Sequence, residues 1–128
     1  MKLLVDTHAF LWAAVESEKL SQTARDWWLN PVSELIISPA SLWEIAIKVS
    51  IGKLQIDQPL DEFFDNQLLI NDIRLLQELP SHAVRLASLP FIHRDPFDRM
   101  IVAQALCENL PLLSADAPLD NYGIQRIW

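Results

Sequence analysis

Short apolar runs alternate with longer segments of helical spacing along the chain of 128 residues, and this alternation constrains the fold more than any other feature. The runs are continuously apolar, which is typical of strands that are covered on both faces. The pattern therefore predicts an α/β fold with a parallel sheet between layers of helices. The five predicted strands cover residues 2–5, 35–37, 73–76, 112–113 and 124–127.

The segments between these runs predict six helices. Capping residues support three of the helix starts, because Ser21 precedes one helix and a proline follows the capping positions Ser38 and Asp95 in two others. Gly52 favours the end of the third helix. No linker, internal repeat or low-complexity tract interrupts the pattern, so we expect one domain over residues 1–128. The predicted helices cover residues 8–15, 22–30, 39–50, 60–70, 81–87 and 96–108.

Composition excludes several classes of protein. An apolar fraction of 51% with 21% charged residues is typical of a globular domain and not of a disordered chain. The first residues do not form a signal peptide, and no apolar run approaches the roughly 18 residues that cross a bilayer. The single cysteine, Cys107, cannot form an internal disulfide, and its apolar surroundings predict a buried thiol. We therefore expect a reducing, cytoplasmic location without a membrane.

The net charge of −7 argues against a protein that holds nucleic acid through a diffuse positive surface. A polyanionic partner would need a local region of positive potential in order to bind. Divalent ions bound by grouped carboxylates supply such a region, because they reverse the local potential. The positions of the acidic residues therefore decide whether this class of partner is feasible.

Four acidic residues fall where the predicted topology brings them to one edge of the sheet. Asp6 and Asp116 follow predicted strands, and Glu44 and Asp98 lie near the starts of predicted helices at the same edge. Carboxylates gathered there would repel one another unless cations neutralised them. Oxygen ligands without a zinc-like Cys and His spacing favour Mg²⁺ or Mn²⁺. Such a cluster suits the attack of a metal-activated water on a phosphodiester.

Each acid also has a structural alternative. Asp6 and Asp116 could cap the helices that follow them. Glu44 fits a capping box with Ser41, and Asp98 fits a similar box or the positive end of a helix dipole. In that case the chain is a non-catalytic protein-interaction module of the same fold. A receiver-like or aspartyl-phosphate phosphatase domain is disfavoured, because Thr7 and His8 follow Asp6 where such domains ordinarily have a second acid.

Four segments carry a resemblance to a known family. They are LLVDTH at 3–8, SPASLWEIAIK at 38–48, HRDPFDR at 93–99 and SAD at 114–116. In this order and spacing, the chain resembles PIN domains, and specifically the VapC-type ribonuclease toxins of toxin–antitoxin pairs. The resemblance covers essentially the whole chain. It implies a three-layer sandwich with a five-stranded parallel sheet, and a Mg²⁺- or Mn²⁺-dependent endoribonuclease that a cognate antitoxin holds inactive.

The resemblance also implies roles for individual residues. Thr7 and Ser114 match positions where the family often places a hydroxyl near the metal, and a turn or cap hydrogen bond is the alternative for both. Asp95 would support the site without binding the metal directly. The implied metal ligands and catalytic acids are Asp6, Glu44, Asp98 and Asp116.

Three cationic residues lie beside these acids in the sequence. Lys48 follows Glu44 by one helical turn, and Arg94 and Arg99 flank Asp98. We expect Lys48, Arg94 and Arg99 to contact RNA phosphates, and each suits an ion pair with the acids equally well.

Histidines and aromatic residues are expected to be structural. No serine or cysteine in a nucleophile context accompanies His8, His82 or His93, so we expect hydrogen-bonding or helix-end roles for them. Burial in a core or an interface is expected for the five tryptophans rather than base stacking. Residues 54–70 hold more apolar side chains than one helix face needs. The resemblance implies that this region binds the antitoxin and the second subunit of a homodimer, although extra core would explain it equally.

Overall fold

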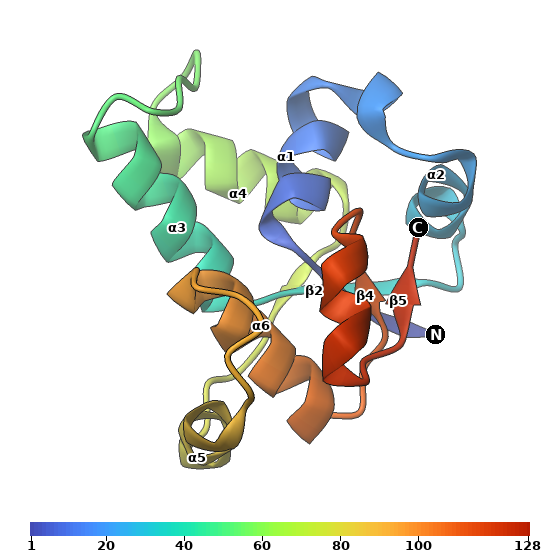
Figure 1. The fold of residues 1–128 in the computed structure, drawn as a ribbon. Coiled ribbons are helices and arrows are strands. Elements are labelled where there is room, and N and C mark those ends of the chain that lie inside the picture. Colours follow the sequence, from blue (N-terminus) through green and yellow to red (C-terminus); the bar gives the residue numbers. More distant parts are fainter.

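A five-stranded sheet organises residues 1–128 in the computed structural model (Figure 1). Its spatial order is β3-β2-β1-β4-β5, and every neighbouring pair of strands is parallel. The prediction of five parallel strands is confirmed. The chain builds the sheet outward from β1 in one direction and then returns to the other side of β1, so the topology switches between β1 and β4. The strands are β1 (Lys2–Val5), β2 (Glu34–Ile37), β3 (Arg74–Leu75), β4 (Leu112–Leu113) and β5 (Arg126–Ile127).

Helices cover both faces of the sheet, as Figure 1 shows. The first layer contains α1 (Thr7–Val15), α2 (Gln22–Leu29) and α4 (Leu60–Ile70). The second layer contains α5 (Pro80–Ser88) and α6 (Pro96–Cys107). The remaining helices are α3 (Pro39–Ser50), which packs against α1 and α6, and the short 3₁₀ helices η1 (Ser17–Lys19) and η2 (Ala117–Tyr122). All six predicted α-helices are confirmed, and each end lies within one residue of its predicted position.

Alternate residues of the central strand enter different cores. Leu3 and Val5 pack in the core under α1, α2 and α4, whereas Leu4 packs in the core under α5, α6 and η2. None of the three side chains has exposed surface. Burial on both faces explains why the strand sequences are apolar without alternation.

Capping side chains begin the helices at the predicted positions. Ser21, Ser38 and Asp95 each accept a backbone N–H from the first turn of the following helix, at 3.0, 3.1 and 2.8 Å. These bonds satisfy N–H groups that have no partner within the helix. None of the helices has the length and hydrophobicity that crossing a bilayer requires.

The end of α3 is set by Gly52, which has a φ of +75°. The Gly52 N–H donates to the Val49 carbonyl at 3.2 Å, and the Lys53 N–H donates to the Lys48 carbonyl at 2.8 Å. This pair of bonds is a Schellman motif, which requires a left-handed residue that glycine adopts without strain. The motif turns the chain sharply and leaves Lys53 beside the last turns of α3.

The predicted burial of the Cys107 thiol is wrong. Cys107 is exposed because it is the last residue of α6, where the helix leaves the core. Trp43 is 66% exposed on α3, so it is not part of the core, and its burial in an interface stays a prediction. The other four tryptophans pack against the core as predicted, and they are Trp12, Trp27, Trp28 and Trp128.

Candidate active site

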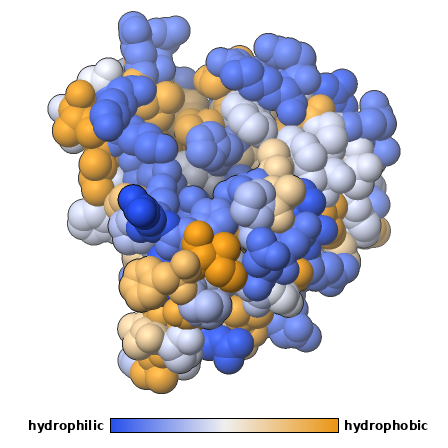
Figure 2. Space-filling view, viewed as in Figure 1, coloured by the Kyte–Doolittle hydropathy of each residue, from blue (hydrophilic) through white to orange (hydrophobic).

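Three of the four predicted acids line one cavity of about 250 Å³ at the carboxyl ends of β1 and β4. Asp6 directly follows β1, Asp116 follows β4, and Asp98 lies in the first turn of α6. The cavity therefore lies where the strand order switches, which is the usual position of a site in an open α/β sheet. Figure 2 shows mostly hydrophilic side chains around the middle of the face where α1, α3, α6 and η2 converge.

Asp6 is buried, with 8% of its surface exposed. Its Oδ1 accepts the Ala9 N–H at 2.8 Å, so Asp6 does cap α1, and the residue lines the cavity as well. Burial raises the pKa of Asp6, while hydrogen bonds from Ser114 and Ala9 only partly oppose this effect. Capping and a place in the site are therefore compatible for this residue.

The pKa of Asp98 is raised to about 7, mainly by burial and then by repulsion from four other acids. In decreasing order of effect, these acids are Asp95, Glu44, Asp6 and Asp116. No hydrogen bond to the Asp98 carboxylate offsets the repulsion. Asp6, Glu44 and Asp116 come from three other segments of the chain, so four segments converge in space at Asp98.

Glu44 is 2% exposed and lies close enough to add to this repulsion. Its Oε2 accepts from Lys48 Nζ at 2.8 Å, whereas its buried Oε1 has no partner. The alternative of a capping box with Ser41 is wrong, because α3 begins at Pro39 with Ser38 as its cap, as predicted. A buried carboxylate oxygen without a partner is costly, and a cation in the site would supply one.

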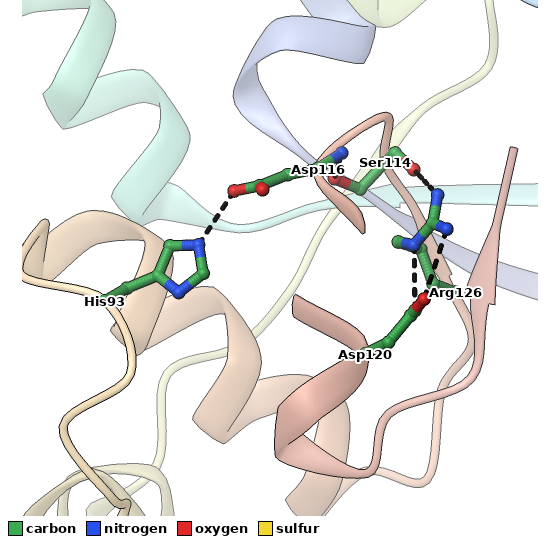
Figure 3. Close-up of polar contacts among 5 residues, drawn as sticks. All are labelled: His93, Ser114, Asp116, Asp120 and Arg126. Carbon is green, nitrogen blue, oxygen red and sulfur yellow. Dashed lines mark hydrogen bonds and ion pairs between the residues drawn. The ribbon is translucent and has the colours of Figure 1, made fainter. Parts of the chain in front are cut away.

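Asp116 precedes η2, but its side chain does not cap that helix. Its Oδ2 lies 2.9 Å from His93 Nε2 (Figure 3). The Asp116 N–H donates to Ser114 Oγ at 3.1 Å, and Arg126 donates to the Ser114 carbonyl at 3.1 Å. Arg126 also forms an ion pair with Asp120 of η2, with Nε 2.8 Å from Oδ1. These contacts fix the turn that carries Asp116.

His93 is the residue that the sequence interpretation undervalued. One ligand atom from each of His93, Asp98 and Asp116 lies within 4.8 Å of the others. His82, in contrast, has the expected helix-end role, because its Nδ1 accepts the Leu79 N–H at 3.2 Å before α5. The position of His93 in HRDPFDR, two residues before the α6 cap, was the available signal.

Two predicted supporting residues have structural contacts. Thr7 is 2% exposed and its Oγ1 donates to Ser41 Oγ at 2.9 Å, which links α1 to α3. Asp95 Oδ1 caps α6 through the Phe97 N–H. Asp95 is also the strongest acidic neighbour of Asp98. The structure therefore places Asp95 beside the acids and gives the Thr7 hydroxyl a partner outside the cavity.

A second cavity, of about 370 Å³, contains a group of cations that we call the basic groove. Lys48, Lys53 and Arg94 line it together with Glu44 and Asp95, so it adjoins the acidic cluster. Lys53 was missed because no motif singles it out, and the Gly52 turn brings it to the groove. The apolar walls of the groove are Ile47, Ile51, Pro96 and Phe97.

The prediction for Arg99 is corrected. Arg99 is 7% exposed, and its guanidinium donates to the Pro90 carbonyl at 2.8 Å and to the Leu86 and Leu89 carbonyls at 3.4 Å. It also lies over the Phe91 ring, 4.2 Å from the centroid. Arg99 follows Asp98 by one residue and so points about 100° around the helix. It holds the α5–α6 connection and does not line either cavity.

The donor set fits a divalent cation. Carboxylates predominate and no cysteine lies nearby, which favours a metal that prefers oxygen. Glu44 Oε1 is buried without a partner, and neighbouring acids repel the Asp98 carboxylate. A bound cation would remove both electrostatic costs.

A parallel sheet of this order, with acids gathered around the end of its central strand, defines an α/β domain with an acidic site. Residues 3–124 match the PIN domain family, and the chain belongs to that family. The expected family is therefore confirmed.

Relatives extend this similarity. Ribonuclease VapC22 of Mycobacterium tuberculosis is 27% identical over 130 residues, which cover 98% of each chain. The VapBC2 structure from Rickettsia felis, bound to a promoter DNA fragment, matches all of both chains with a TM-score of 0.72 and 13% identity. VapBC-1 from nontypeable Haemophilus influenzae matches with a TM-score of 0.66 and 16% identity, covering 98% of this chain and 96% of that one. These structures confirm the three-layer fold.

Proposed function

We propose that this chain is a metal-dependent endoribonuclease of the VapC type, the toxin of a toxin–antitoxin pair. The observation that carries the proposal is the convergence of Glu44, Asp6 and Asp116 on Asp98, whose pKa is raised to about 7 by burial and by repulsion from these acids and Asp95. Isolated helix caps would not bring acids from separate segments so close together. The similarity to a relative named as a ribonuclease supports RNA as the substrate.

The proposed cofactor is Mg²⁺ or Mn²⁺, held by Asp6, Asp98 and Asp116. When bound, the cation would activate a water and stabilise charge on the phosphodiester. Hydrogen bonds from Ala9 to Asp6, and the Ser114 turn beside Asp116, keep both carboxylates in position before substrate arrives.

Glu44 has a different proposed role. Lys48 holds its Oε2, so Oε1 is the free oxygen that can complete the ligand set or accept a hydrogen bond from a water. The Lys48 contact also limits rotation of the carboxylate, which favours one orientation of that oxygen.

The basic groove is the proposed path of the RNA backbone. Lys53 and Arg94 form no ion pair in the protein, and Lys48 has one, with Glu44. Unpaired cations beside an acidic cluster offer phosphates a local attraction that the net charge of −7 does not provide. Ile47 and Ile51 add an apolar wall against which bases can pack.

Protein partners are proposed for the exposed apolar surface of α4. Leu69 and Ile70, at the end of this helix, are 81% and 75% exposed. Apolar side chains gathered in this way are typical of interaction surfaces. We assign this region to the antitoxin and to a second copy of the chain, and we place the protein in the cytoplasm with its RNA substrate.

Cleavage of single-stranded RNA tests the proposed function. We expect the purified chain to cut RNA with Mn²⁺ or Mg²⁺, and excess EDTA to stop the reaction until metal is restored. Asp6→Asn should reduce cleavage by at least about 100-fold, because a ligand is lost while a cap is retained. The exposed Asp57→Asn variant is the matched control and should retain full activity. Cleavage at full rate in excess EDTA would contradict the metal assignment.

A further inference from the structure

We propose that His93 is a direct ligand of the bound metal and gives the site a preference for Mn²⁺ over Mg²⁺. This inference rests on the proposed metal site and adds a nitrogen to its ligands. It starts from the position of the imidazole, which comes from the α5–α6 connection and points at Asp116 (Figure 3).

The spacing of the donor atoms suits coordination. His93 Nε2 lies 2.9 Å from Asp116 Oδ2, and Asp98 offers an oxygen within 4.8 Å of both. Ligands about 2.1–2.2 Å from a cation and at right angles to each other are about 3 Å apart. His93 and Asp116 therefore have the separation of adjacent ligands without any movement of the chain.

The surroundings of His93 hold the ring in this place. The His93 N–H donates to Tyr122 Oη at 2.7 Å, and the two rings lie 5.7 Å apart. Tyr122 is 8% exposed and ends η2, the helix that follows Asp116. The same buried tyrosine thus ties the His93 backbone to the element that carries the partner carboxylate.

The hydrogen-bonding state of the imidazole is compatible with a cation. Nε2 donates to the Asp116 carboxylate, which can only accept, and the buried Nδ1 has no partner. A cation held by Nε2 would replace this hydrogen bond, with the ring N–H on Nδ1.

The nitrogen ligand implies selectivity. Mg²⁺ strongly prefers oxygen ligands in octahedral geometry, whereas first-row transition ions accept imidazole nitrogen. Removal of the imidazole should therefore weaken Mn²⁺ binding more than Mg²⁺ binding. A role for His93 as a hydrogen-bond donor behind Asp116 would instead affect both metals alike.

Pulsed electron paramagnetic resonance and calorimetry test the inference on the intact chain with Mn²⁺ or Mg²⁺ alone. We expect ¹⁴N coupling in the spectrum of bound Mn²⁺, and its loss in His93→Gln. Calorimetry of this variant should show Mn²⁺ affinity at least about tenfold lower, with Mg²⁺ affinity changed by less than about twofold. His82→Gln, which removes an imidazole that does not line the cavity, is the control and should change neither affinity at a temperature where it is folded.

Absence of ¹⁴N coupling in the unmodified chain would overturn the inference, and this reading does not depend on how the variant folds. An equal loss of both affinities in His93→Gln, or no loss, would also overturn it. RNA cleavage separates the two proposals. Nitrogen coupling in a chain that leaves RNA intact would overturn the ribonuclease function alone, and cleavage with an all-oxygen Mn²⁺ site would overturn the His93 assignment alone.

Discussion

The pKa of Asp98 depends on the arrangement of the whole site. The sequence context of Asp98, the first turn of a capped helix, equally suits a structural acid. In the fold, burial, the neighbouring Asp95 and three acids from distant segments raise its pKa to about 7. No pattern within the HRDPFDR segment reveals that repulsion, because three of the acids, Asp6, Glu44 and Asp116, arrive from other parts of the chain.

The raised pKa of Asp98 predicts a pH-dependent cost in the metal-free protein. Between about pH 4 and pH 7 the folded chain binds more protons than the unfolded chain, so this residue lowers stability as pH rises through that range. Asp98→Asn removes the cost. In EDTA, we expect the variant to melt a few degrees above the unmodified chain at pH 8, and the difference to vanish toward pH 4.

Thermal melting at several pH values, with Asp57→Asn as the matched control, checks this prediction. The control should melt with the unmodified chain at every pH, because Asp57 is exposed. A melting temperature for Asp98→Asn at or below that of the unmodified chain at pH 8 would contradict the repulsion.

The spacing of residues in the sequence could not predict which way each helix turns its side chains. Periodicity and capping located α6 to within one residue, but they did not indicate which way each side chain faces. Asp98 and Arg99 are adjacent, yet one lines the cavity and the other enters the α5–α6 connection. The capping box offered as an alternative for Glu44 required Ser41 as the cap, and it is wrong because the cap is Ser38, three residues earlier.

Arg99→Gln should destabilise the fold without affecting the metal site. Loss of the guanidinium leaves the carbonyls of Leu86, Leu89 and Pro90 without their charged donor, at a cost of about 2–3 kcal/mol in the free energy of unfolding. Urea unfolding measures this cost, and Mn²⁺ affinity at a temperature where the variant is folded should match that of the unmodified chain. Weaker Mn²⁺ binding with unchanged stability would contradict the structural role and would mean that Arg99 contributes to the metal site.

Topology accounts for the part of the site that was predictable from the sequence. A strand order that switches beside β1 brings the ends of β1 and β4 together, so Asp6 and Asp116 could be expected at one edge. His93 was undervalued and Lys53 was missed, because irregular connections position both. Turn geometry and long-range hydrogen bonds, such as that between His93 and Tyr122, set their places.

The distribution of charge over the whole molecule predicts how RNA is held. Against a background of −7, Lys53 should contribute through local attraction to phosphate. Lys53→Gln should weaken binding of a single-stranded RNA and lower the slope of log affinity against log salt by about 0.7. Fluorescence anisotropy with Mn²⁺, in an Asp98→Asn background that does not cut, measures both quantities.

Lys2→Gln is the matched control for that experiment. Lys2 is an exposed lysine at the start of β1, so it lies at the amino ends of the strands, opposite the site. The substitution removes the same charge and should leave both affinity and salt slope nearly unchanged. Equal effects of the two substitutions would mean that RNA responds to net charge and not to the basic groove.

Thermal melting of the chain with and without Mn²⁺ at pH 8 tests the convergence of the acids most directly. A single pocket that binds the ion only in the folded state should gain about 2.7 kcal/mol of stability at a metal concentration 100 times the Kd. The melting temperature should therefore rise by several degrees, and Asp116→Asn should abolish most of the rise. An unchanged melting temperature at saturating Mn²⁺ would contradict the account, since separate helix caps would give that result.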